Sequence, residues 1–219
     1  MSWLDKLERR YGNKGIPNLM QWLVGGQLLL YVATLLLNRY ELLGLLGLSR
    51  AGLLHGQVWR LFTFVFLPTS WGNPLLVFIS LYFYYFLGNA LENAWGTFRF
   101  NVFLACNMVG AWLACLITGS ATSMGLYYSI FFAFACLFPD MQVMLFFILP
   151  IKVKWMGLFS GALYLIEFLL AGSWAARASM ALCLAGFFLF FGKGLWHTGF
   201  QSWRNYKRRK EWQNQWKNR

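Results

Sequence analysis

The sequence has few charged residues, and acidic residues are the scarcest among them. Charged residues make up 12% of its 219 residues, with 19 lysines and arginines against 7 aspartates and glutamates. Apolar residues account for 59%, which is above the share typical of soluble domains. The positive charge lies mainly at the two ends and in short connections, so it favours contact with anionic lipid, and no nucleic-acid partner is expected. The composition therefore predicts a membrane-embedded chain.

Cysteine is also scarce, and its placement excludes a disulfide framework. The four cysteines are Cys106, Cys115, Cys136 and Cys183. They lie inside apolar runs with no paired spacing, so they are expected to be small buried hydrophobic residues and not metal ligands. We expect no metal and no other cofactor. The N-terminus, MSWLDKLERR, is charged and amphipathic, and it therefore lacks the pattern of a cleavable signal peptide.

What the sequence does contain is long apolar runs. A helix needs about 20 apolar residues to cross a bilayer, and six runs are predicted to do so: 19–37, 75–91, 98–118, 124–138, 153–171 and 177–196. The fourth run would be only ~22 Å long at 1.5 Å per residue, less than the ~30 Å of the hydrocarbon layer. It is expected to be enclosed by its neighbours, with one end open to a water-filled hollow. The sequence thus predicts an all-α, polytopic membrane protein of six helices.

These runs divide the chain into three parts. Residues 1–18 are expected to form an amphipathic segment at the membrane surface, 19–196 the membrane domain, and 197–219 a basic, tryptophan-rich tail. Most lysines and arginines fall in the two ends and in connections on one side of the predicted bundle. The positive-inside rule then predicts that both termini are cytoplasmic. The short length and the absence of organelle signals suggest a bacterial plasma membrane.

Small residues recur every four positions in the fourth run, at Gly125, Ser129 and Ala133. Gly157 and Gly161 form a similar pair in the fifth run. Such spacing lets two membrane helices approach closely. Ordinary helix packing is the favoured interpretation of both patterns, ahead of a binding site.

Three stretches, in this order, resemble the rhomboid superfamily of intramembrane serine proteases. GQVWRLFTFVFLP (56–68) resembles its first-loop motif, and LGNALENAWGTFRF (87–100) resembles the exit of its second span. AFACLFPD and ILPIKVKW, within 133–155, resemble the end of its fourth span and the following loop. The positions that match the family's motifs are Gly56, Gln57, Trp59, Arg60, Gly88, Glu92, Trp95, Gly96 and Gly125. The resemblance implies a rhomboid-like bundle of six helices, with Trp59 and Arg60 fixing the first loop at the membrane edge.

The resemblance also implies where a Ser–His dyad would lie. The family's serine sits in a G-x-S-G turn at the outer end of the fourth span, and its histidine lies on the sixth span. Ungapped placement puts these two positions on Met124 and Ser179, and a thioether can neither attack a carbonyl nor transfer a proton. The chain therefore resembles the non-catalytic branch of the family, the pseudoproteases. This implies that it binds membrane-spanning segments of client proteins, beside the first loop and the second and fifth spans.

Two alternatives stay open at this point. An active intramembrane serine protease could use a realigned serine, Ser123, with His55 as its base, but the one-residue shift would turn the side chain by ~100°. A small-solute channel or transporter could use the hollow and Glu167, because a carboxylate inside a membrane is costly and often functional. Glu167 could also simply pair with Arg177.

Overall fold

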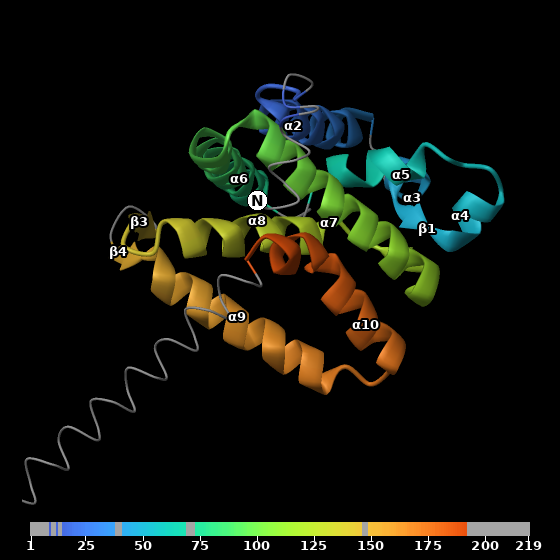
Figure 1. Cartoon of the computed structure of the whole chain (residues 1–219). Helices are drawn as coiled ribbons and strands as arrows, with labels where there is room; N and C mark the ends of the chain where they lie inside the picture. The colour runs from blue at the N-terminus through green and yellow to red at the C-terminus, as the bar shows by residue number, and fades with distance from the viewer. Residues whose placement is uncertain are drawn as a thin grey trace, which may run out of the picture.

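The computed structural model describes residues 15–37, 41–68, 73–145 and 149–191, together with Arg9 and Gly12. Most of these residues are helical (Figure 1). The longer helices are α2 (Leu19–Leu37), α6 (Pro74–Trp95), α7 (Thr97–Thr118), α8 (Met124–Leu137), α9 (Val153–Leu170) and α10 (Trp174–Cys183). The predicted tail, 197–219, and most of the predicted amphipathic segment, 1–18, lie outside the described residues.

Four helices are long and apolar enough to cross a membrane, namely α2, α6, α7 and α9. A fifth candidate is a bent pair, in which α10 and the helix Ala185–Phe191 meet at 53°. Helix α8 has 14 residues, fewer than the ~20 that span a bilayer. The described part of the chain therefore has four or five candidate spans, fewer than the six that the sequence predicts.

Prolines and glycines set the ends of the long helices. Helix α6 begins at Pro74, where the side chain of Asn73 accepts a hydrogen bond from the N–H of Leu75. It ends just before Gly96, whose φ of +85° is a backbone conformation that residues other than glycine rarely adopt. Helix α7 ends in the same way at Gly119, with a φ of +92°. Helix α6 therefore continues to Trp95, beyond the end of the second predicted helix, 75–91.

The connection between α2 and α6 is folded into short elements. They are α3 (Glu41–Leu46), β1 (Leu48–Ser49), α4 (Arg50–Leu54), α5 (Arg60–Thr63) and the 3-10 helix η2 (Phe64–Phe66). Strand β1 pairs antiparallel with β2 (Ser120–Ala121), with Leu48 opposite Ala121. This pairing holds the connection against the end of α7, where Figure 1 shows the cyan elements grouped.

A second antiparallel pair joins α8 to α9. It consists of β3 (Gln142–Leu145) and β4 (Leu149–Lys152), with Gln142 opposite Lys152. Near its base, the side chain of Lys152 lies 3.6 Å from that of Asp140. This hairpin was not expected from the sequence, which predicted an all-α protein. The described residues are mainly helical, with two small sheets.

Helix α8 lies in the centre of the molecule, with other helices around it (Figure 1). Eight of its residues are buried: Gly125, Leu126, Tyr127, Ser129, Ile130, Phe131, Ala133 and Phe134. The helix is therefore enclosed by its neighbours, as its short length led us to expect.

The small residues of α8 face α10. A Cβ added to Gly125 would lie 2.3 Å from the Cβ of Cys183, so only glycine allows this approach. One turn further on, the hydroxyl of Ser129 donates to the carbonyl of Cys183 at 3.3 Å. Ala133, a turn beyond, is fully buried. These contacts fit the interpretation of the pattern as helix packing.

Candidate functional site

A cavity of about 440 Å³ lies at the N-terminal end of α8. Helices α8, α9 and α10 and strand β2 contribute its walls. It is lined by Ser120, Ala121, Thr122, Met124, Gly125, Tyr128, Tyr164, Glu167, Ser179, Met180 and Cys183. The structure thus brings together the two positions that the resemblance assigned to a dyad, Met124 and Ser179, and places Glu167 in the same cavity.

The lining of this cavity differs from a Ser–His site in the residues that it presents. A serine nucleophile needs a base within hydrogen-bond reach, and the lining contains no histidine. Met124 is 43% exposed and presents a thioether. Among the hydrogen bonds of the described residues, none joins Ser179 to the carboxylate of Glu167. The described chain also holds no group of three or more His, Cys, Asp or Glu side chains that could bind a metal ion.

Ser123 and His55, the alternative pair, lie in different surroundings. Ser123 is buried, and its hydroxyl donates to the carbonyl of Leu67 at 3.1 Å. His55 is exposed at the end of α4, with its Nδ1 2.7 Å from the carbonyl of Ala51. Because β1 and β2 are antiparallel, the chain that leads to His55 runs away from Ser123. Each side chain bonds to a backbone carbonyl, and no hydrogen bond joins the two among the described residues.

A buried polar cluster holds the end of the first connection over α8. The Nε2 of Gln27 donates to the carbonyl of Val65 at 2.8 Å and to the hydroxyl of Tyr127. That hydroxyl in turn donates to the carbonyl of Val65 at 3.2 Å. Neither side chain was singled out from the sequence, although a glutamine in the middle of an apolar run, as Gln27 is, was a signal. Together with Ser123, the cluster fixes residues 64–67 between α2 and α8.

Arg60 fixes the rest of the first connection. It is only 7% exposed. Its Nε donates to the side chain of Gln57, and one terminal nitrogen donates to the carbonyls of Gly44 and Gly47, each at 2.6 Å. A Cβ added to Gly52 would lie 2.4 Å from the Nε. The guanidinium therefore ties α3, α4 and α5 into one unit.

Two neighbouring motif residues lie at the surface of this unit. Gly56 has a φ of +82°, which lets the chain turn after α4. Trp59 is 52% exposed, and its indole N–H donates to the carbonyl of Leu45 at 3.3 Å. Neither residue lines the cavity that contains Met124.

Glu92 joins the starts of two helices at the opposite end of α6. Its carboxylate accepts hydrogen bonds from the backbone N–H of Asn18 at 3.0 Å and from the hydroxyl of Thr97 at 3.1 Å. These groups lie just before α2 and at the first residue of α7. A carboxylate at helix N-termini is favourable, because the helix dipoles place partial positive charge there.

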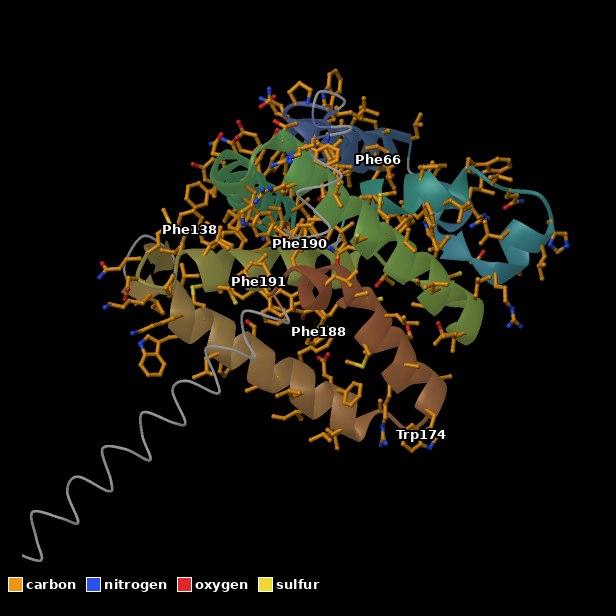
Figure 2. All side chains as sticks on the ribbon, in the orientation of Figure 1. Phe66, Phe138, Trp174, Phe188, Phe190 and Phe191 are labelled. Atoms are coloured by element: carbon orange, nitrogen blue, oxygen red, sulfur yellow. The ribbon has the colours of Figure 1, made fainter. Side chains whose placement is uncertain are left out.

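The other second-span motif residues make packing contacts. A Cβ added to Gly88 would lie 2.3 Å from the Cγ of Met20, so α2 and α6 approach closely at this point. The ring of Trp95 lies 5.3 to 5.6 Å from three phenylalanine rings: Phe103, Phe190 and Phe191. Figure 2 shows Phe190 and Phe191 reaching from the last described helix towards the centre of the bundle.

A second, larger cavity of about 700 Å³ lies between α8, α9 and α10. It exists because α9 diverges from its neighbours, and Val153 is the one buried residue of that helix. Its lining is almost wholly apolar and includes Phe132, Ala135, Gly157, Gly161, Leu165, Phe187 and Phe188. Phe188 points into the gap between α9 and α10 (Figure 2). Tyr164 lines both cavities, so they adjoin.

Glu167 does not pair with Arg177 in this structure. The guanidinium of Arg177 donates to the carbonyls of Leu169 at 3.1 Å and Ala171 at 3.2 Å, and it lies 5.3 Å from the ring of Trp174. The last carbonyls of α9 have no partner within the helix, and they carry its partial negative charge. They hold the guanidinium, and the ion pair with Glu167, which the sequence left open as one alternative, is not among the contacts of the described residues.

The chain was compared with known protein families and with curated proteins. A family described as "Eukaryotic integral membrane protein (DUF1751)" matches residues 21–191, which include every helix from α2 to the last one described. No curated protein matches the chain. The family's description argues against the predicted bacterial membrane, and the side on which each terminus lies stays a prediction. The match covers most of the chain, so this protein is an integral membrane protein that belongs to that family.

Proposed function

We propose that this protein is a rhomboid-like pseudoprotease: it binds membrane-spanning segments of partner proteins and does not cleave them. In this proposal the bundle has six spans. They are the four long helices, the short α8, and the bent pair formed by α10 and Ala185–Phe191 taken as one. The buried contacts of Arg60 and Glu92 support the rhomboid-like fold, because these are the motif residues on which the resemblance depends.

The observation that carries the proposed function is the apolar cavity beside α9. Membrane helices associate through close packing at small residues, since lipid offers no hydrophobic driving force between them. Gly161 faces this cavity with no atom nearer to an added Cβ than 3.9 Å, the distance to Phe132. The walls belong to the fourth, fifth and sixth proposed spans. The site therefore differs from the expected one, which lay beside the first loop and the second and fifth spans.

Binding is tested with a designed helix in vesicles. The probe is a 21-residue leucine–alanine helix that carries photo-leucine, and its crosslinking to the purified protein is measured against the probe-to-lipid ratio. We expect saturable crosslinking in the parent protein. Gly161→Phe places a ring inside the cavity, in the space that the probe would occupy. It should lower the apparent affinity for the probe about tenfold, which corresponds to ~1.4 kcal/mol. Crosslinking that rises linearly, as random encounters would make it do, contradicts the proposal.

Two glycines provide matched controls for this substitution. Gly25, on α2, also has no atom within 4 Å of an added Cβ, so Gly25→Phe should leave probe binding unchanged. By contrast, a Cβ added to Gly157 would lie 2.7 Å from that of Ala135. Gly157→Phe should therefore disturb α8–α9 packing itself. Equal effects of Gly161→Phe and Gly25→Phe would contradict the assignment of the site.

The absence of cleavage is tested with a serine-directed fluorophosphonate. We expect no covalent labelling of the fourth span, because Met124 occupies the nucleophile position and the hydroxyl of Ser123 is buried against Leu67. Removing the nucleophile or base of a serine protease lowers turnover by a factor on the order of 10⁶. Labelling of Ser123 that is abolished by Ser123→Ala would instead support the protease alternative.

The channel alternative has one supporting observation, which is the exposed carboxylate of Glu167 in the smaller cavity. The adjoining larger cavity is almost wholly apolar, and such a passage disfavours polar solutes. Solute flux into vesicles that contain the protein, lost in Glu167→Gln, would favour this alternative over helix binding.

A further inference from the structure

We propose that Glu167 selects partner helices that carry a lysine or arginine near the end that lies beside the C-terminus of α9. This inference rests on the proposed function and specifies its partner. A helix lying along α9 would fill the apolar cavity with its own apolar side chains. Its basic side chain would then enter the smaller cavity and pair with the carboxylate.

The position of Glu167 sets the depth of the matching charge. The residue lies three positions before Leu170, the last residue of α9, or ~4.5 Å along the axis at 1.5 Å per residue. Lys154, the one charged residue that lines the larger cavity, lies at the other end of the helix, ~20 Å away on the same rise. We therefore expect the basic residue of the partner to lie about one helical turn from the end of the partner's helix.

No cation of the described chain neutralises Glu167. The lining of its cavity includes no lysine, arginine or histidine. The nearby guanidinium of Arg177 is engaged with two carbonyls and the ring of Trp174. The partial negative charge at the C-terminal end of α9 has the same sign as the carboxylate, so both favour a cation. The site has the charge that a basic side chain would complement.

The geometry favours a long side chain. Residues of α9 that face the larger cavity, such as Gly161 and Leu165, lie on one side of the helix. At ~100° per residue, Glu167 lies ~140° around the helix from the middle of that side. Tyr164 lies between the two and lines both cavities. A lysine or arginine can extend its charged end past this ring while its stem stays on apolar surface.

Four probe helices test the inference by the photo-crosslinking measurement. They share the leucine–alanine sequence and differ only at one position, one turn from the end, where they carry Leu, Lys, Gln or Glu. Each probe is measured with the parent protein and with Glu167→Gln, in vesicles of phosphatidylcholine and phosphatidylglycerol. We expect the parent protein to bind the Lys probe about tenfold more tightly than the Gln probe, and the Glu probe most weakly. This preference should vanish in Glu167→Gln and reverse in Glu167→Lys.

The outcomes separate this inference from the proposed function. Equal binding of all four probes to the parent protein, with the Leu probe still blocked by Gly161→Phe, overturns the selectivity and leaves helix binding intact. If the choline headgroups of the lipid bind the carboxylate of Glu167, the four probes should also bind equally. A preference for Lys that persists in Glu167→Gln likewise overturns the inference. Failure of every probe to saturate overturns the proposed function itself.

Discussion

Arg60 is a charged side chain in an apolar connection, and its hydrogen bonds offset the cost of burying it. Its hydrogen bonds reach α3, the turn that follows it and the side chain of Gln57. A lysine in its place has no planar fork with which to hold all three acceptors at once. At the scale of single residues, this guanidinium fixes the connection that precedes α6.

Arg60→Lys is therefore expected to lower stability. Hydrogen bonds that involve a charged group contribute about 1.5–3 kcal/mol, so losing some of them should lower the midpoint of thermal unfolding in detergent by several degrees. Arg50→Lys is the matched control, because the side chain of Arg50 is exposed and makes a single 3.3 Å bond to the carbonyl of Leu116. Equal midpoints for the two variants would show that Arg60 does not fix the connection.

The cluster around Gln27 supports a second prediction at this scale. Gln27→Leu removes the donor to Val65 and to Tyr127, so it should destabilise the protein by about 1–3 kcal/mol. Gln21 lies exposed on the same helix, and Gln21→Leu should leave the midpoint of thermal unfolding unchanged. A Gln27→Leu variant as stable as Gln21→Leu would contradict the role given to this cluster.

Single elements differ in how completely neighbouring helices cover them. Helix α8 is enclosed, whereas α9 has Val153 as its one buried residue. Helices α7 and α10 approach closely, and a Cβ added to Gly110 would lie 2.1 Å from the carbonyl oxygen of Leu182. That contact lies two residues before the break at Leu184, where α10 gives way to the last helix.

Gly110→Ala tests whether this contact holds α10 in place. Backbone atoms would have to move, since a carbonyl cannot rotate away as a flexible side chain can. Overpacking of this kind costs about 1–3 kcal/mol, and the unfolding midpoint should fall accordingly. Gly25→Ala meets no atom within 4 Å and should be neutral or slightly stabilising. A neutral Gly110→Ala would contradict the close approach of α7 and α10.

The elements also show which features a sequence can predict. The first predicted helix, 19–37, coincides with α2, and the fourth and fifth predicted helices each extend one residue beyond α8 and α9. These limits follow from apolar runs and from local signals at prolines and glycines. The break in the sixth helix does not follow from local sequence signals. It lies among contacts made by α7 and α8, such as the hydrogen bond from Ser129 to Cys183.

The candidate site was predictable only in part. Ungapped placement put Met124 and Ser179 in positions that line one cavity, and Glu167 was singled out as an unusual carboxylate. Its relation to Arg177 was not predictable, because it depends on the carbonyls at the end of α9. The larger cavity was also missed, since it arises from the angle at which α9 leaves α8.

At the scale of the whole molecule, the number of spans determines where the termini lie. Six spans place both ends on the same side of the membrane, and five place them on opposite sides. We expect tags at residues 1 and 219 to be equally accessible to protease from one side of sealed vesicles, and both to be protected from the other. Protection of one tag alone would show that α8 or the bent pair does not cross the membrane.

The most direct test of the central claim is a contact map made with photo-leucine in place of Leu165, which lines the larger cavity, or of Leu29, which is exposed on α2. Each variant is reconstituted with the leucine–alanine helix, and the crosslinked fraction is measured with and without excess unlabelled probe. The account predicts strong crosslinking at 165 that the competitor abolishes, and weak crosslinking at 29 that it does not change. Equal crosslinking at the two positions, insensitive to competitor, would contradict a helix-binding site beside α9.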